Sequence, residues 1–327
     1  MRASVLSSYS EVAVALGLNP RAMLQRVGLP SATFEEPDLL ISADAVVELL
    51  ELSANERACP DFALRMAERR QLSHFGVASL LLSQLSTVRE AIRVAHQFRH
   101  LVNDALAVHL EETDGVAVMH LEVLTSRRMA AAQTTELSLA AVVQLIRVIL
   151  GPAWRPICVH FRHPSPPDAE PHRRLFRCAV EFDALFNGVS FAAADLDRAN
   201  PAADARLAAY AQGFLQALPD PGADVATAEV KRLIHLLLPL GRANLKFVAQ
   251  TMGRNPRTLQ RALDAEGLTF SALLDDARRD LALRYLADRR FSIGHVAAQL
   301  GYANHGAFTR WFVETFQMSP KAWRRQT

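Results

Sequence analysis

The stretch VAQTMGRNPRTLQRAL, residues 248–263, decides the fold of the C-terminal part of the chain, because it returns as VAAQLGYANHGAFTRWF at residues 296–312. The two copies align in steps of 48 residues before the second turn and of 49 residues after it, as from Leu259 to Phe308. Each copy holds a short apolar-periodic segment that ends at glycine, a polar turn, and a longer segment at helical spacing. The repeat therefore predicts an all-α module in which one unit is used twice.

The order of segments in each copy is typical of a helix-turn-helix, the motif that places its second helix in the major groove of DNA. We expect the first unit at about 244–266, a linker helix at about 271–288, and the second unit at about 292–316. Eighteen residues at the helical rise span about 27 Å, close to one turn of DNA once the flanking elements are added. The two second helices could thus enter successive major grooves.

The first copy carries side chains that are suited to base recognition. Asn255 can cap a helix that begins at Pro256. Three outward positions then follow, Arg257, Gln260 and Arg261. Arginine can donate twice to guanine, and glutamine can pair with adenine. The second copy has Asn304 as its cap candidate and places His305, Thr309 and Arg310 on the face that we expect to be exposed.

A structural alternative is an amphipathic helical hairpin whose charged face is exposed to solvent and binds no nucleic acid. Two copies with matched core positions argue against it, and so does the charge distribution. Residues 241–327 hold 14 Lys and Arg against 7 Asp and Glu, whereas residues 1–240 hold 22 against 27. A basic module joined to an acidic one is typical of a DNA-binding domain attached to a larger partner domain. In the linker helix, Arg278 and Arg279 could contact phosphate or pair with Asp275 and Asp276.

Length and composition exclude several protein classes. The chain has 327 residues, of which 50% are hydrophobic and 21% charged, as expected for ordered, soluble domains. The N-terminus lacks the pattern of a secretory signal, and the longest apolar stretches are too short to cross a membrane. The cysteines Cys59, Cys158 and Cys178 are far apart, so we expect no disulfide framework, no metal site and a reduced cytoplasmic location.

The N-terminal two thirds predict an α+β domain over residues 1–220. Helical periodicity up to about residue 100, with caps at Ser42 and at Ser86 or Thr87, gives way to the alternation of a hairpin over 105–123. We expect a long helix at 129–150, short strands at 157–161, 179–182 and 189–192, and a loop at 163–172. A Pro- and Gly-rich boundary at 218–224 precedes the DNA-binding domain, residues 225–327.

The doubled turn, the linker RRDLALRYLAD at 278–288 and the closing run GYANHGAFTRWFVETFQMSPKAWRR at 301–325 resemble the AraC/XylS family of bacterial transcription regulators. The N-terminal part is similar to the sensor domain of the ornithine-regulator branch, notably at LGLNPRAMLQRVGLP (16–30) and FDALFNGVSFAAADLDRANP (182–201). It does not resemble the small β-barrel of the arabinose regulator.

The resemblance implies a regulator whose N-terminal domain binds a small-molecule effector and forms a homodimer, and whose C-terminal domain binds promoter DNA and recruits RNA polymerase. It implies no cofactor and leaves activation or repression open, although activators are common in the family. The base-reading positions map onto the residues named above and onto Gly306, where a side chain is usual; the phosphate candidates are Arg254, Arg278 and Asn304.

Several alternatives remain at the level of sequence. An architectural DNA-binding protein whose N-terminal domain only oligomerises is the runner-up, and an apolar ligand-sized cavity in residues 1–200 would argue against it. The run LGLNPRAMLQR imitates the reading helix, but we expect it to pack in the core. The aromatic and histidine side chains His74, Phe75, His96 and Phe98 could line a pocket or serve the core.

An enzyme is not expected. His160 and His163, with His172 nearby, lack the helical spacing of a metal-binding HExxH motif, so we expect solvated or capping histidines.

Overall fold

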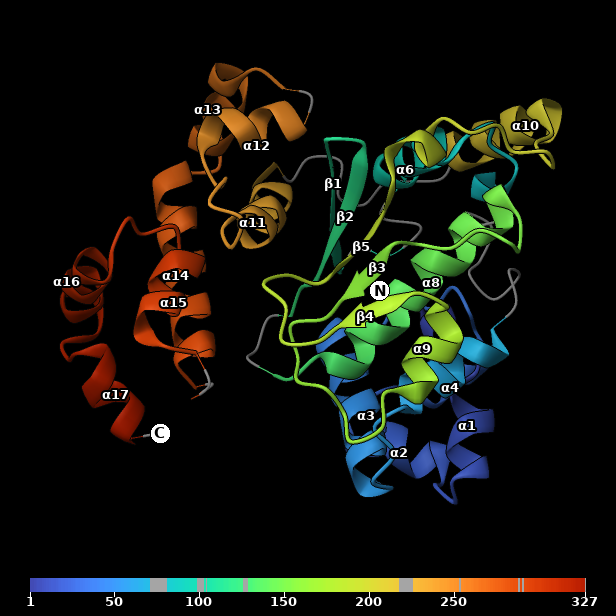
Figure 1. Ribbon diagram of the computed structural model, residues 1–327, viewed down its shortest axis with the longest axis horizontal. Coiled ribbons are helices and arrows are strands. Elements are labelled where there is room, and N and C mark those ends of the chain that lie inside the picture. The colour runs from blue at the N-terminus through green and yellow to red at the C-terminus, as the bar shows by residue number, and fades with distance from the viewer. Residues whose placement is uncertain are drawn as a thin grey trace. The chain divides into compact units, whose positions relative to one another are not determined.

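The structure is a computed structural model that describes residues 1–70, 81–98, 103, 105–125, 129–217, 226–252, 254–287, 289 and 291–326. Its contacts divide the chain into two compact units, Met1–Asp220 and Pro221–Thr327, and each is described here by itself (Figure 1). The predicted boundary at 218–224 lies outside the described residues.

Helices make up the start of the N-terminal unit, as the periodicity predicts. They are α1 (Tyr9–Ala15), α2 (Pro20–Arg26), α3 (Ala43–Glu56), α4 (Phe62–Arg69) and α6 (Val88–Gln97), with the short 3-10 helices η1 (Ala3–Leu6) and η2 (Ser31–Phe34). The side chain of Ser42 accepts a hydrogen bond from the backbone N–H of Ala45, and that of Thr87 from Glu90. Both predicted caps are therefore confirmed, with Thr87 rather than Ser86 as the second.

A five-stranded sheet follows, in the order β1-β2-β5-β3-β4. The strands are β1 (Leu106–Thr113), β2 (Val116–Val123), β3 (Cys158–His160), β4 (Ala179–Glu181) and β5 (Gly188–Ala192). The hairpin of β1 and β2 turns at Asp114 and Gly115, whose φ values of 51° and 79° are those a type I′ turn requires. All pairs are antiparallel except β3 with β4.

The parallel pair is joined by α9 (Glu170–Phe176), which the sequence analysis missed by assigning a loop through residue 172. The prolines of that segment suggested a break. Pro171, however, stands in the first turn of the helix, where the missing backbone N–H has no partner to lose. The η4 turn (Ala193–Leu196) and α10 (Ala205–Ala217) complete the unit.

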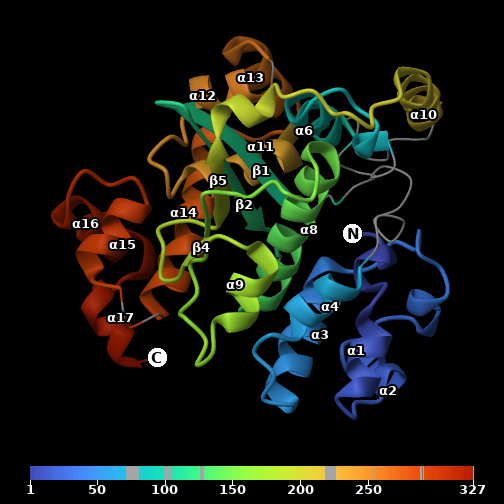
Figure 2. The ribbon, with the colours of Figure 1, turned by 45° about the vertical axis from the view of Figure 1, so that its right-hand side comes forward.

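The central element is α8 (Ala132–Leu150), which begins three residues later than predicted and packs against α3, α4, β2 and β5 (Figures 1 and 2). Its N-terminus is held by α3, because the Glu51 carboxylate accepts a hydrogen bond from the Gln133 N–H at 2.8 Å. Its length and composition would suit a membrane span, but 67% of its most apolar window is buried. It therefore has the burial expected of a core helix in a folded domain.

One face of the sheet is apolar and the other is polar. Residues of β2 and β5 that point toward α8, such as Met119, Val189 and Phe191, are buried in one large core. The alternate residues, including Cys158 and His160, lie on the opposite face, since side chains alternate along a strand. This polar face is the setting of a cluster that is taken up below.

The C-terminal unit is entirely helical. It contains α11 (Ala226–Leu237), α12 (Leu245–Thr251), α13 (Pro256–Ala265), α14 (Phe270–Ala287), α15 (Ile293–Gln299), α16 (His305–Phe316) and α17 (Pro320–Gln326). Two separate cores form, one around Leu259 and one around Phe308, and α14 contributes to both, for instance through Leu273 and Leu281. The predicted fold class, an α+β domain followed by an all-α domain with a linker helix, is confirmed.

Candidate nucleic-acid interface and ligand pocket

The two helix-turn-helix units are built from the same local interactions. Asn244 and Ser292 cap the first helices, α12 and α15. The turns close with equivalent backbone hydrogen bonds, from the Arg254 N–H to the Ala249 carbonyl at 2.8 Å and from the Tyr302 N–H to the Ala297 carbonyl at 3.0 Å. The second unit then contains its extra residue before the cap of α16, as the alignment predicts.

The second helices, α13 and α16, align in sequence with a constant step of 49 residues. The side chain of Asn255 accepts from the Arg257 N–H at 2.9 Å, and that of Asn304 accepts from the Ala307 N–H at 2.8 Å, so both predicted caps are confirmed. By the same step Arg257 corresponds to Gly306. Gln260 likewise corresponds to Thr309, and Arg261 to Arg310.

The outer face of α13 is free for recognition. Arg257, Gln260 and Arg261 are exposed, while Leu259 and Leu263 are fully buried beneath them. Within the part of the chain that the structure describes, none of the three exposed side chains has a hydrogen bond or an ion pair. They can therefore contact DNA without breaking an interaction that stabilises the fold.

The outer face of α16 presents fewer side chains for contact with bases. His305 and Arg310 are exposed, and Gly306 contributes only backbone. Thr309 is a correction, because it is half-buried and its hydroxyl oxygen is buried without a hydrogen bond to any described residue. The equivalent residue of the first unit, Gln260, is exposed. A different rotamer would be needed to bring the hydroxyl to a base.

The three phosphate candidates differ in availability. Arg254 is exposed in the turn before α13, whereas the Oδ1 atom of Asn304 is already used by its cap. Arg278 lies against its own domain: its guanidinium is 5.1 Å from the Tyr302 ring and 3.5 Å from Asp275, and only 23% of its side chain is exposed. This arrangement favours the ion-pair alternative for Arg278. Its neighbour Arg279 is 55% exposed.

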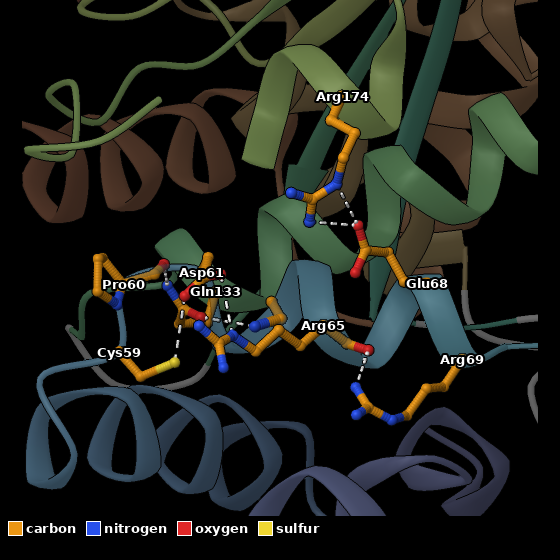
Figure 3. A network of polar contacts seen from close by, with 9 residues as sticks. Cys59, Pro60, Asp61, Arg65, Glu68, Arg69, Gln133 and Arg174 are labelled. Carbon is orange, nitrogen blue, oxygen red and sulfur yellow. Dashed lines mark hydrogen bonds and ion pairs between the residues drawn. The ribbon is translucent and has the colours of Figure 1, made fainter. Parts of the chain in front are cut away.

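A cavity of about 660 Å³ opens in the N-terminal unit, where α4 and the segment before it face α9. This volume is within the usual range for small-molecule sites. The lining is charged rather than apolar, in contrast to the cavity that the sequence analysis proposed as a test. Its charged residues are Arg57, Asp61, Arg65, Glu68, Arg69, Asp168 and Arg174. Figure 3 shows five of them, Asp61, Arg65, Glu68, Arg69 and Arg174.

Two of these arginines are neutralised by neighbours. Arg65 pairs with Asp61 at 2.9 Å, and Arg174 pairs with Glu68 at 2.7 Å. Burial alone would raise the pKa of Asp61, but hydrogen bonds from Arg65 and Cys59 outweigh it and lower that pKa. Burial and the hydrogen bond to Asp61 raise the pKa of Cys59 to about 11, so this cysteine is a neutral thiol.

The other two arginines are not neutralised by a carboxylate. Among the described residues, Arg57 hydrogen-bonds only to the Gly17 carbonyl and Arg69 only to the Arg65 carbonyl. Both guanidiniums retain donors for an anionic group of a ligand. The sequence did not predict this site, because its residues come from three segments of the chain. The local signal was the spacing of Arg65 and Arg69, which are one helical turn apart.

Of the four pocket residues that the sequence suggested, the two that the structure describes do not line the cavity. Phe98 is in the core, and His96 is exposed on α6 away from the cavity; His74 and Phe75 lie outside the described residues. The imitation of a reading helix at 16–26 forms α2, whose Met23 and Leu24 are buried in the N-terminal core. A packing role for this segment is thereby confirmed.

Of the histidines expected to be solvated or capping, one is fully buried and another is only partly exposed. His172 is fully buried, and its Nε2 atom lies 2.8 Å from Glu136 of α8. His163 lies 3.4 Å from the same carboxylate. Burial lowers the pKa of His163, although the charge of Glu136 opposes the shift. The sequence carried no sign of this cluster, because its carboxylate comes from a helix more than twenty residues earlier.

Comparison with known proteins gives matches over nearly the whole chain. A profile described as the arabinose-binding domain of the AraC transcription regulator, N-terminal, matches residues 17–200, and a helix-turn-helix domain profile matches residues 248–326. The HTH-type transcriptional regulator VirS of Mycobacterium tuberculosis is 28% identical over 99% of this chain and 96% of its own length. The ornithine utilization regulator of Pseudomonas aeruginosa is 25% identical, with 88% and 87% covered. The crystal structure of CdpR from Pseudomonas aeruginosa aligns with a TM-score of 0.45 at 20% identity, covering 93% and 96% of the two chains.

Proposed function

Since this chain belongs to the AraC family of transcription regulators, we propose that α13 and α16 read the bases of a promoter site. The observation that carries the proposal is the exact step of 49 residues between two capped helices that turn unpaired polar side chains outward. Arg257, Gln260 and Arg261 are the readers of the first helix. His305 and Arg310 are those of the second, with Thr309 joining after a change of rotamer.

Phosphate contacts would set the register of the two helices on the duplex. Arg254 is well suited because it is exposed directly before α13. The amide nitrogen of Asn304 can donate to phosphate while its oxygen caps α16. On the linker helix, we retain Arg278 as a candidate, but Arg279 is the more exposed of the pair.

Selection of binding sites from random duplexes by the full-length protein tests this proposal. We expect an enriched motif with two elements about 10 base pairs apart, because the linker helix α14 sets the separation of the reading helices. Enrichment of one element alone, or of none, would argue against reading by both helices. Because affinity for DNA depends on salt, the selection should be repeated at two ionic strengths.

A small molecule bound in the N-terminal domain would control this regulator. The charged cavity between α4 and α9 is our candidate for its site, and the unneutralised Arg57 and Arg69 favour a polar effector with an anionic group. A thermal-shift screen of carboxylates, polyols and apolar compounds would identify such a ligand. A compound that raises the melting temperature and changes DNA affinity supports control by an effector. Stabilisation by no compound in the screen would favour the alternative, an architectural protein whose N-terminal domain only oligomerises.

The proposed partners are a second copy of the chain and RNA polymerase, in the cytoplasm, and we assign no catalysis to the N-terminal domain. An exposed apolar pair supports the homodimer: on α10, Leu207 is 50% exposed and Tyr210 77% exposed, three residues apart and thus on one helix face. Sedimentation should show a dimer that Tyr210→Glu weakens. A monomer at concentrations of tens of micromolar would remove the dimer from the mechanism.

A further inference from the structure

The polar face of the sheet holds a cluster that the regulator function does not use. Cys158 and His160 lie two residues apart on β3, so their side chains project from the same face. Glu181 is paired with His160 across the parallel β3–β4 ladder. One ligand atom from each residue, the cysteine sulfur, an imidazole nitrogen and a carboxylate oxygen, lies within 4.8 Å of the other two.

The neighbouring strand orients the imidazole. The Ser190 hydroxyl on β5 lies 3.3 Å from the Cys158 carbonyl oxygen and 3.1 Å from Nε2 of His160. When the hydroxyl donates to the carbonyl, its oxygen can accept a hydrogen bond from Nε2, and the lone pair of Nδ1 then faces Glu181. Ring orientation by a hydrogen bond of this kind is usual for histidines that bind metals.

The contact between His160 and Glu181 can hold either a proton or a cation. Nδ1 of His160 and Oε2 of Glu181 are 2.7 Å apart, the distance of a hydrogen bond through a proton on Nδ1, and a metal ion would take the place of that proton. A tetrahedral zinc ion separates its nitrogen, oxygen and sulfur ligands by about 3.3–3.6 Å. Side-chain movements of less than about 1 Å would open the cluster to that geometry.

The surroundings allow a cation to enter. Glu181 has 57% of its side chain exposed and His160 has 15%, while the Phe186 ring lies 4.8 Å from the imidazole and forms an apolar wall. Cys158 would bind the ion as a thiolate, the form in which cysteine ligates metals.

We propose that Cys158, His160 and Glu181 bind a divalent cation of the zinc class, with water in the fourth position. Thiolate and imidazole are the ligands that zinc prefers, whereas magnesium and calcium prefer oxygen alone. The ion would join β3 to β4 at the edge of the sheet. The sequence did not predict this site, because Cys158 and His160 form no familiar motif and strand pairing brings in their third partner. This site does not depend on the proposed effector or on DNA binding.

Cobalt(II) tests the proposal on the reduced full-length chain, since cobalt replaces zinc and reports a thiolate ligand by a charge-transfer band in the near ultraviolet. We expect one cobalt ion per chain, with the band present, and its displacement by zinc. Cys158→Ser should abolish the band. Glu181→Gln, at an exposed position, should weaken binding by about tenfold or more, and Ser190→Ala, which removes the hydrogen-bond partner of Nε2, by about 10- to 100-fold.

Cys178→Ser is the matched control, because Cys178 is a second partly buried thiol beside the same strands and lies outside the cluster. It should keep both the band and the affinity. Circular dichroism checks that each variant is folded, and the exposed Glu181→Gln keeps the test valid if Cys158→Ser misfolds. Cobalt binding without the band, an unchanged affinity of folded Glu181→Gln, or loss of the band in Cys178→Ser would each overturn the assignment.

Discussion

Arg261 and Arg310 provide the sharpest test of reading by both helices, because they occupy equivalent positions of α13 and α16. Both are exposed, and among the described residues neither guanidinium makes a hydrogen bond or an ion pair. Replacement by alanine should therefore change the free energy of unfolding by no more than about 0.5 kcal/mol. The effect on DNA binding can then be attributed to lost contacts with DNA.

The expected loss follows from the contact that each arginine can make. A bidentate hydrogen bond to guanine contributes about 1–3 kcal/mol of discrimination, which corresponds to a loss of affinity of about 5- to 150-fold. The two units have separate cores, so the costs should add in the double variant to about 2–6 kcal/mol. Loss of preference should be confined to one base position for each single variant.

Binding-site selection with Arg261→Ala, Arg310→Ala and the wild type measures both effects. The two relaxed positions should lie about 10 base pairs apart. Lys321→Ala is the control, since it removes one exposed positive charge from α17 and should leave the motif unchanged. If both arginine variants keep the wild-type motif, or relax the same base pair, the two helices do not read successive grooves.

Four further outcomes can be measured. Gly306→Arg should tighten specific binding about fivefold or more and add a base preference, because it places an arginine at the position equivalent to Arg257. The nearest atom to the new Cβ would be Oδ1 of Asn304 at 3.4 Å. An unchanged selected motif would contradict this prediction. A fragment of residues 226–326 should fold as helices by circular dichroism and bind DNA, since both of its cores close within it. Burial lowers the folded-state pKa of His163, so the unfolded state binds more protons below pH about 6.5, and the free energy of unfolding should fall as the pH drops from there toward the lowered pKa. Denaturant titrations at several pH values should show that the free energy of unfolding of His163→Gln depends less on pH than that of the wild type. Arg69→Ala should keep the melting temperature of the free protein and weaken any anionic effector found by the screen, and equal stabilisation of variant and wild type would place the effector elsewhere.

The sequence predicted the C-terminal domain closely because its determinants are local. Caps such as Asn255 and Asn304, glycine at the end of a helix and apolar spacing each act within one or two turns of chain, and the repeat allowed each copy to check the other. Side-chain direction was less secure. Thr309 is half-buried although the equivalent Gln260 is exposed, a difference that periodicity alone does not predict.

The sites of the N-terminal domain could not be predicted, because each is assembled from distant segments. The cavity joins Arg57 and Arg69 to Arg174, more than 100 residues later. The polar cluster at Cys158 needs the pairing of β3 with β4, and that parallel pair depends on α9, the helix that the prolines concealed. Hydrophobic period indicates which face of an element is buried, but not which titratable groups tertiary packing brings together.

The two proposed reading helices are not equal, and the inequality predicts how sequence information is distributed along the DNA site. Among the described residues, α13 presents three polar side chains without a hydrogen-bond partner, whereas α16 presents His305 and Arg310 around a glycine and a half-buried threonine. Each good base contact adds discrimination at one position, so the element bound by α13 should be the more strongly specified. The second unit would then contribute register and phosphate affinity more than sequence choice. If most of the specificity comes from the DNA element bound by α13, the second unit must be held at a fixed distance from the first. The linker helix α14 can fix this distance because it places residues in the cores of both units.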